Sequence, residues 1–398
     1  MVQSENQPLR FVWIGGMDAV DPSEWDALAL PLETPLLEWE WLYQLEASGS
    51  ISPANGWAPR HLTVRRGDRL VAAAPLYLKS HSQGEFVFDY AWADVSRRLG
   101  SRYYPKLVGM SPVTPIVGYR FLIAPEEDER EMTRRMTEEI DRLCKGANLS
   151  GVGFHFVDER WAKWLPELGF CGWLHQGFVW KNKNYENFND YLGQFTSNQR
   201  RNIRRERKSM GKQGLTIRRF AGKDIDPRLA EPMWRFYEAT NDQYGPWGCK
   251  YLTRNFFENI FRRYRHRLLL IAAFPNGDAG EPVGMSMLLQ KSGQVLGRYW
   301  GSEVEIPNLH FNACYYEPIE WAIRHGARQF DPGMGGSHKI RRGFEAFGNH
   351  SYHRFMDPRL AYIMRSHIDE INQAEQEQID AVNAAIPFAQ RGNDSSRH

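Results

Sequence analysis

The sequence contains few cysteines and no long apolar run, and both absences limit what the protein can be. Its 398 residues include only four cysteines, and no two of them form a CxxC pair. This spacing excludes a disulfide framework or a zinc knuckle and favours a reducing, cytoplasmic environment. No run of about 18 uncharged apolar residues occurs, and the amino terminus lacks the pattern of a secretory signal. We therefore expect neither export nor a transmembrane segment.

The signature motifs of several enzyme classes are also missing. The sequence has no GxxxxGK[ST], no GxGxxG after a strand, no HExxH and no GxSxG. The strongest sequence indications of nucleotide hydrolysis, dinucleotide binding, zinc proteolysis and serine hydrolysis are thus absent. The histidines are scattered without ligand spacing, so we expect no metal. A formal net charge of only +2 provides no global field for DNA binding, so any electrostatic function must come from local clusters.

Apolar and aromatic residues are plentiful and alternate between strand and helix patterns. Hydrophobic residues make up 42% of the chain, and 14 tryptophans supply material for large cores. The patterns predict strands at 60–66, 69–79, 85–90, 268–274, 282–290, 294–301 and 328–331, and helices at 125–146 and 309–325. The chain is too long for one ordinary core. We predict an α/β protein with mixed sheets and two domains.

The two halves share short sequence matches in the same order. At an offset of 212, Val71, Leu76, Lys79 and Tyr103–Tyr104 match Val283, Leu288, Lys291 and Tyr315–Tyr316; at 209, Gly84 and Tyr90 match Gly293 and Tyr299. These matches favour a duplicated unit. We predict domains at 1–180 and 181–375 and a polar, flexible tail at 376–398. A cleft between two such units is a natural ligand site.

A strongly basic segment opens the second half. Thr196 and Gln199 form a capping-box pattern, and the apolar spacing predicts an amphipathic helix over about 196–210. From Asn198 to Arg219 the chain has nine Lys or Arg and one acid, Glu206, a local net charge of +8. Two interpretations stay open, a solvated helix face and a site for a phosphate-bearing ligand such as tRNA.

The segment FDPGMGGSHKIRRGFEAFG, residues 330–348, joins a glycine-rich loop to a basic run. Glycines let a backbone approach another molecule closely, and the neighbouring cations suit an anionic or carbonyl-bearing ligand. A tight turn followed by a solvated basic face is the alternative. His338 directly follows the glycines and is the histidine that we single out.

Several segments together resemble a known family. They are HSQGEFVFDYAWAD, YYPKL, YENFNDYLGQF with RRNIRRERK, GRYWG, LHFNACYYEPIEWAI and GGSHKIRRGFEAF. From about Trp25 to Arg354 the chain resembles a bacterial family of predicted N-acyltransferases that is similar to the FemABX proteins of the GNAT superfamily. The resemblance implies a tandem pair of GNAT-like domains. FemABX proteins move an amino acid from aminoacyl-tRNA to a peptidoglycan precursor, whereas ordinary GNAT enzymes use acyl-CoA.

The resemblance implies an N-acyltransferase whose donor, acyl-CoA or aminoacyl-tRNA, is attacked directly by an amine on a small molecule or a cell-wall precursor. Two departures stand out, because the family is expected to carry Glu where this chain has Asn312 and Ser337. The GNAT pyrophosphate signature Q/R-x-x-G-x-G/A is not visible either. The alternative function is a catalytically silent binding module for a cell-wall precursor or RNA. A membrane-surface role of the basic helix is disfavoured, because the helix lacks a bulky apolar face.

Acyl transfer needs a proton acceptor, a proton donor and donors for the oxyanion. The predicted catalytic residues are Asp331 or His338 as acceptor and Tyr315 or Tyr316 as donor. The predicted substrate-binding residues are Gly333, Gly335, Gly336, Lys339, Arg341, Arg342, Arg200, Arg201, Arg204, Glu85, Asp89 and Lys106. For each group a structural role is the alternative: Asp331 capping a turn, the tyrosines lying in the core, and the set around Lys106 satisfying buried backbone groups.

Overall fold

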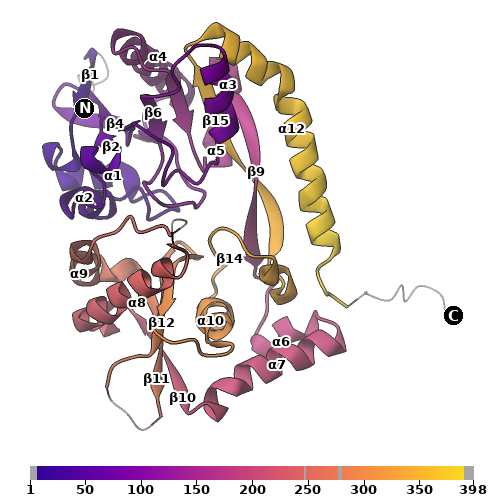
Figure 1. The fold of residues 1–398 in the computed structure, drawn as a ribbon. Helices are drawn as coiled ribbons and strands as arrows, with labels where there is room; N and C mark the ends of the chain where they lie inside the picture. The colour runs from indigo at the N-terminus through magenta and orange to yellow at the C-terminus, as the bar shows by residue number, and fades with distance from the viewer. Residues whose placement is uncertain (1–6, 246–247, 277–279, 390–398) are drawn as a thin grey trace.

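The computed structural model describes residues 7–245, 248–276 and 280–389. Two lobes share one continuous sheet of eleven strands, so the predicted α/β architecture with mixed sheets is confirmed. In Figure 1 the first half of the chain forms the upper lobe and most of the second half forms the lower one. The long strands β9 (Cys171–Lys181) and β15 (Glu345–Phe355) run between them.

The large sheet is ordered β10-β11-β12-β13-β14-β9-β15-β8-β6-β5-β2. Its lower-lobe strands are β10 (Leu215–Ala221), β11 (Leu268–Pro275), β12 (Gly284–Lys291), β13 (Gln294–Ser302) and β14 (Gln329–Asp331). Its upper-lobe strands are β8 (Gly151–Phe154), β6 (Lys106–Gly109), β5 (Tyr77–Lys79) and β2 (Trp57–Pro59). A second sheet, β1-β3-β4-β7, lies in the upper lobe and consists of β1 (Leu9–Ile14), β3 (His61–Arg66), β4 (Arg69–Ala74) and β7 (Leu122–Ile123).

The helices cover the sheets through apolar faces. The upper lobe has α1 (Pro22–Ala29), α2 (Trp39–Ala47), α3 (Tyr90–Arg98), α4 (Glu129–Gly146) and α5 (Glu159–Ala162). The lower lobe has α6 (Phe188–Gly193), α7 (Ser197–Lys212), α8 (Ala230–Asp242), α9 (Arg254–Arg263), α10 (Leu309–Phe311) and α11 (Glu317–Arg324). The largest core contains residues of both halves, from Trp25 to Leu296, so hydrophobic burial joins the two lobes.

The last helix, α12 (Pro358–Ala384), begins in the upper lobe, where β15 ends, and runs beside β9 and β15 toward the lower lobe (Figure 1). Its Asn372 side chain accepts from the Leu174 amide at 2.8 Å and donates to the Gly172 carbonyl at 2.9 Å. The prediction of a flexible tail from Gln376 is therefore wrong as far as Ala384, because the helix continues to that residue. Residues 390–398 of that tail lie outside the described residues.

Other differences from the expected elements have local causes. Residues 85–89 form a loop rather than a strand, in which Phe86 has a φ of 57°, and Tyr90 already begins α3. The predicted helix at 309–325 is present but contains a π turn over Asn312–Tyr316. The predicted helix from Pro125 begins only at Glu129, where the Asp128 side chain accepts from the Glu131 amide.

The proposed internal repeat stays a prediction, as do the domain boundaries. Lys79 and Lys291 each end a strand with a buried ammonium, as a duplication requires. Tyr103–Tyr104, however, precede β6 in a loop, whereas Tyr315–Tyr316 lie in a helical segment. β15, from the second half, also pairs with β8 of the first.

Candidate functional site

A cavity opens where two parallel strands of the lower lobe separate. β13 and β14 pair from Gln294–Gln329 to Leu296–Asp331. β14 then ends, because Pro332 has no amide hydrogen to donate, while β13 continues to Ser302. The cavity has a volume of about 530 Å³, and residues of both lobes line it. This is the cleft between halves that the sequence predicted.

A β-bulge shapes the wall of this cavity. Met287 of β12 pairs with Tyr299 and Leu288 pairs with Gly297, so that Arg298 is an extra residue in β13. Such a bulge disrupts the ladder and redirects a side chain. Arg298 lines the cavity.

The glycine loop after β14 forms another wall. Gly333, Gly335 and Gly336 have φ angles of 81°, 69° and 89°, a region that side-chain-bearing residues rarely adopt. The Gly333 amide donates to Asp331 Oδ1 at 2.8 Å, and the buried Lys339 Nζ donates to the Gly333 and Met334 carbonyls at 2.6 and 3.0 Å. Lys339 therefore braces the loop from within. Burial lowers the pKa of Lys339 to about 8, although the Asp331 carboxylate opposes that shift.

Tyr315 and His338 form a hydrogen-bonded pair in the cavity wall. The Tyr315 hydroxyl lies 2.8 Å from His338 Nε2, and both residues line the cavity. Burial, together with the charges of Arg342 and Lys339, lowers the pKa of His338, so its imidazole is neutral at pH 7 and can accept a proton. Burial raises the pKa of Tyr315, so its hydroxyl stays protonated and can donate.

Two further side chains of the cavity wall, His310 and Cys314, stay uncharged. Burial lowers the pKa of His310 to about 3 and raises that of the Cys314 thiol well above its ordinary value. A protonated thiol is a poor nucleophile. The Cys314 thiol is therefore a poor candidate nucleophile in this cavity.

Asp331, the other predicted proton acceptor, lies on another side of the loop. It lines two neighbouring cavities of about 380 and 540 Å³ instead of the cavity that contains Tyr315 and His338. Burial raises its pKa to about 6, partly offset by the hydrogen bond from Gly333. The geometry thus gives Asp331 the turn-capping role that was its alternative.

Tyr316, Arg341 and Arg342 do not line the cavity. Tyr316 is fully buried and its hydroxyl donates to Glu206, so the alternative of a core tyrosine holds for it. Arg342 is buried, donates to Glu206 Oε2 at 2.7 Å and lies 3.5 Å above the ring of Phe311. Arg341 is exposed. The assignment of Arg342 as a phosphate clamp is therefore not supported, because its charge is already paired within the protein.

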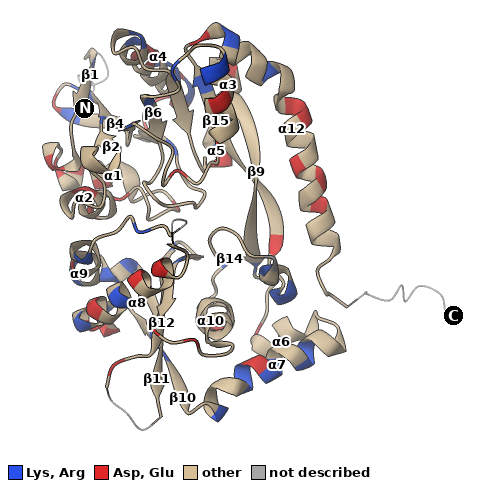
Figure 2. Cartoon of the chain, viewed as in Figure 1, with Lys and Arg blue, Asp and Glu red and all other residues tan. Residues whose placement is uncertain are grey.

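The predicted basic helix is α7, and Figure 2 shows its cations along the lower edge of the molecule. Thr196 Oγ1 accepts from the Gln199 amide at 3.4 Å, whereas the Gln199 side chain donates to the Arg341 carbonyl at 2.6 Å instead of completing the capping box. Arg200 donates to the Phe195 carbonyl at 2.9 Å, in the short segment that joins α6 to α7.

Arg201 and Arg204 are exposed and lie outside the cavity. They remain available to a large partner that approaches from outside.

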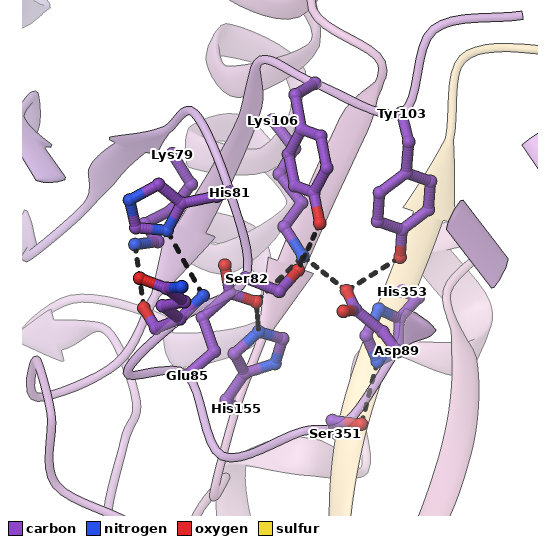
Figure 3. Close-up of polar contacts among 12 residues, drawn as sticks. Lys79, His81, Ser82, Glu85, Asp89, Tyr103, Lys106, His155, Ser351 and His353 are labelled. Atoms are coloured by element: carbon purple, nitrogen blue, oxygen red, sulfur yellow. Dashed lines mark hydrogen bonds and ion pairs between the residues drawn. The ribbon is translucent and has the colours of Figure 1, made fainter. Parts of the chain in front are cut away.

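Glu85, Asp89 and Lys106 form a buried network in the upper lobe (Figure 3). Lys106 Nζ donates to Glu85 Oε2 at 2.7 Å, to Ser82 Oγ at 3.0 Å and to Asp89. The Tyr103 hydroxyl donates to Asp89 Oδ2 at 2.8 Å. These side chains are almost fully buried and line none of the described cavities, so they act on one another instead of on a ligand.

The comparison with protein families decides the identity at the level of family. A model described as FemAB-like, peptidoglycan biosynthesis/recognition, matches residues 16–390. The chain belongs to this FemAB-like family. No curated protein matches the sequence.

Solved structures support the fold of this family member. A crystal structure of FemX is 13% identical, with 89% of this chain and 99% of that chain covered and a TM-score of 0.53. L-PGS from Bacillus licheniformis is 10% identical (92% and 97% covered, TM-score 0.51). The C-terminal domain of a putative lysylphosphatidylglycerol synthetase from Agrobacterium fabrum is 9% identical (88% and 96% covered, TM-score 0.51). The likeness to FemX supports the mixed α/β fold, whereas the tandem duplication stays a prediction.

One expected departure from the FemAB-like pattern lies away from the cavity. Asn312 Nδ2 donates to the carbonyls of Glu206 and Asn308 at 3.1 and 2.9 Å, and the residue lines a separate groove beside α7 and α11. The amide at this position therefore removes no group from the cavity. The backbone of Ser337, the other departure, begins the 3₁₀ turn Ser337–Arg342.

Sequence reasoning missed Arg298 and undervalued His310 as cavity residues. A β-bulge depends on strand pairing, which a single sequence does not specify. It also missed two strained positions, because Phe86 and Val113 line the cavity with φ angles of 57° and 49°. Such strain in bulky residues is most often found at functional sites.

Proposed function

We propose that this FemAB-like protein transfers an acyl or aminoacyl group from acyl-CoA or aminoacyl-tRNA to an amine, with transfer taking place in the cavity between β13 and β14. The observation that carries the proposal is the 2.8 Å hydrogen bond between Tyr315 and His338 in the wall of that cavity. It joins a neutral base to a protonated acid, which are the two groups that such a reaction needs.

The transfer is a direct attack. The amine nitrogen bonds to the carbonyl carbon of the ester or thioester, and the bond from that carbon to the leaving oxygen or sulfur breaks. His338 accepts the proton of the attacking amine, and Tyr315 gives its hydroxyl proton to the leaving atom. The hydrogen bond between His338 Nε2 and Tyr315 then returns a proton to the tyrosine, so no net proton is gained or lost.

The oxyanion that develops during the attack needs donors close by. The Gly333 amide is already bonded to Asp331. Gly335 and Gly336 line the cavity on the loop that Lys339 braces, and we assign their amides to the oxyanion. A braced loop holds such donors in place before the reaction, which is where their catalytic benefit arises.

Two features favour an aminoacyl-tRNA donor and a cell-wall-precursor acceptor. The family is described by peptidoglycan biosynthesis/recognition, and α7 exposes Arg201 and Arg204 on the outer surface. Exposed cations on one helix suit the phosphates of an RNA, which is too large to enter the cavity whole.

Calorimetric titrations with aminoacyl-tRNA, uncharged tRNA and acyl-CoA, run side by side at moderate salt, test this proposal. A preference for charged over uncharged tRNA supports aminoacyl transfer, whereas saturable binding of acyl-CoA alone reassigns the donor. Binding without any turnover supports the silent binding module. If none of the three ligands binds, the proposed donors are contradicted.

A further inference from the structure

Arg298 is a cation in the cavity wall that no carboxylate neutralises. Its Nη2 donates to the Val113 carbonyl and to the Tyr299 hydroxyl, both at 2.7 Å, and both acceptors are uncharged. Its Nε is buried and has no hydrogen-bond partner. Among the described residues, no Asp or Glu oxygen forms an ion pair with Arg298 within 4.0 Å.

Comparable arginines in the same chain differ in this respect. Arg342 and Arg354 also have a buried Nε without a hydrogen-bond partner, but each pairs through another atom with a carboxylate, namely Glu206 and Asp141. Arg298 is half-buried, and charges that are withdrawn from water are normally paired, because an isolated one costs solvation energy. Arg298 is the member of this set, within the described ranges, whose counter-charge is missing.

The cavity itself has a one-sided charge. Its lining, as far as the described residues show it, includes the cations Arg298 and Lys339 and the neutral His310 and His338 but no Asp or Glu. Asp331 is close enough to sense the charge of Arg298, yet it lies outside this lining and bonds the loop amide instead.

Two features of the backbone position Arg298 in the cavity wall. It is the extra residue of the β-bulge, and a Cβ on the preceding Gly297 would lie 3.2 Å from the carbonyl carbon of Pro332. The glycine thus lets the bulge lie directly against the loop.

We propose that Arg298 binds an oxyanion group, carboxylate or phosphoryl, of the substrate in this cavity. The inference rests on the proposed function only in treating the cavity as the substrate site. A guanidinium presents several donors in a planar fork that matches such oxyanions, and the unbonded Nε offers one of them. The bound oxyanion positions the substrate beneath the bulge, next to the Tyr315–His338 pair. Arg298 is a binding residue in this account and takes no part in proton transfer.

The test uses inorganic pyrophosphate and succinate as probes, titrated calorimetrically into the full-length protein and two variants. Arg298→Gln removes the charge but keeps an amide donor. The hydrogen bond from this position in the lower lobe to the Val113 carbonyl in the upper lobe can therefore persist. Arg228→Gln removes a charge whose side chain is 91% exposed and which lies outside the cavity lining, so it is the control. Circular dichroism verifies that both variants fold.

We expect the wild type to bind one probe saturably and Arg298→Gln to bind it at least about tenfold more weakly, since bonds to charged groups contribute about 1.5–3 kcal/mol. Arg228→Gln should bind as the wild type does. A preference for pyrophosphate indicates a phosphoryl group, and a preference for succinate indicates a carboxylate. Equal binding by Arg298→Gln and wild type, or no binding of either probe, overturns the inference. Because the assay needs no turnover, anion binding through Arg298 without acyl transfer leaves this inference standing and refutes only the proposed activity.

Discussion

Replacing Lys106 with methionine should destabilise the upper lobe strongly. The ammonium bonds Glu85 and Asp89, and the second carboxylate oxygen of each acid is buried without a partner. Removing the cation leaves two buried carboxylates without the ammonium that bridges them, although His155 still lies 3.1 Å from Glu85 and Tyr103 still donates to Asp89. Breaking a buried ion pair from one side costs about 3–5 kcal/mol. That loss is a large part of the roughly 5–15 kcal/mol by which domains are stable.

The pH dependence of the same variant sharpens the prediction. Burial by itself would raise the pKa of Asp89, but Lys106 and the hydrogen bonds around it lower the pKa from 3.8 to about 2. This depressed pKa contributes roughly 2 kcal/mol at neutral pH, which is lost as the pH falls from about 4 to 2. Without Lys106 the sign reverses, because burial then favours the protonated acid. The deficit of the variant should therefore shrink between pH 7 and pH 5.

Urea unfolding, followed by circular dichroism and tryptophan fluorescence, measures both effects. The control is Arg97→Met, which removes a cation paired with Asp94 on α3, where the arginine side chain is 80% exposed. This control should leave the midpoint unchanged, since exposed ion pairs contribute little. A loss below about 1 kcal/mol in Lys106→Met at pH 7, or a deficit that grows toward pH 5, would refute the account of the network.

Three further predictions concern the site and α7. Tyr315→Phe should lower kcat by about 10²–10⁴-fold with donor binding unchanged, as measured by single-turnover transfer; an unchanged rate would remove the proposed proton donor. Gly336→Ala places a Cβ 2.5 Å from Cε1 of His338, whereas Gly335→Ala meets no atom within 4 Å although its φ is also left-handed. Only the Gly336 variant should therefore lose transfer, and equal losses would mean that loop strain alone is responsible. The double change Arg201→Ala/Arg204→Ala should leave unfolding unchanged while reducing the salt dependence of tRNA binding by roughly one to two units of log–log slope; an unaltered slope would place RNA elsewhere.

Regular elements with local signals could be predicted from the sequence. The helix at 309–325 and the strands around it follow from apolar periodicity, and the basic helix follows from its amphipathic spacing and Thr196 cap. The loop at 85–89 could not be recognised, because its aromatic residues match strand composition while Phe86 adopts a left-handed conformation that only the tertiary structure stabilises. The helical part of 376–384 was missed for a similar reason. Polar residues there pack against β9 and β15 through side-chain bonds such as that of Asn383 to the Ala346 amide at 2.7 Å.

The candidate site was predictable in part. The glycine loop, His338 and Tyr315 could be singled out because glycines and a histidine adjoin in sequence, and the structure places them in one wall. Whether a given cation is paired with a carboxylate could not be predicted, since the partner can lie far away in the sequence. Glu206 is 136 positions from Arg342 in the chain yet neutralises it, while Arg298 has no such partner among the residues that the structure describes.

The central claim is that the cavity beside the Tyr315–His338 pair transfers an acyl group to an amine. It is tested most directly by incubating wild type, His338→Gln and Arg201→Gln with labelled aminoacyl-tRNA or labelled acyl-CoA and an amine-bearing cell-wall precursor. The account predicts that wild type and Arg201→Gln both move the label from one of these donors onto the amine. If that donor is tRNA, Arg201→Gln does so more slowly. His338→Gln folds and binds the donor but does not move the label. Label that stays on a donor bound by the wild type, or transfer by His338→Gln at the wild-type rate, would contradict it.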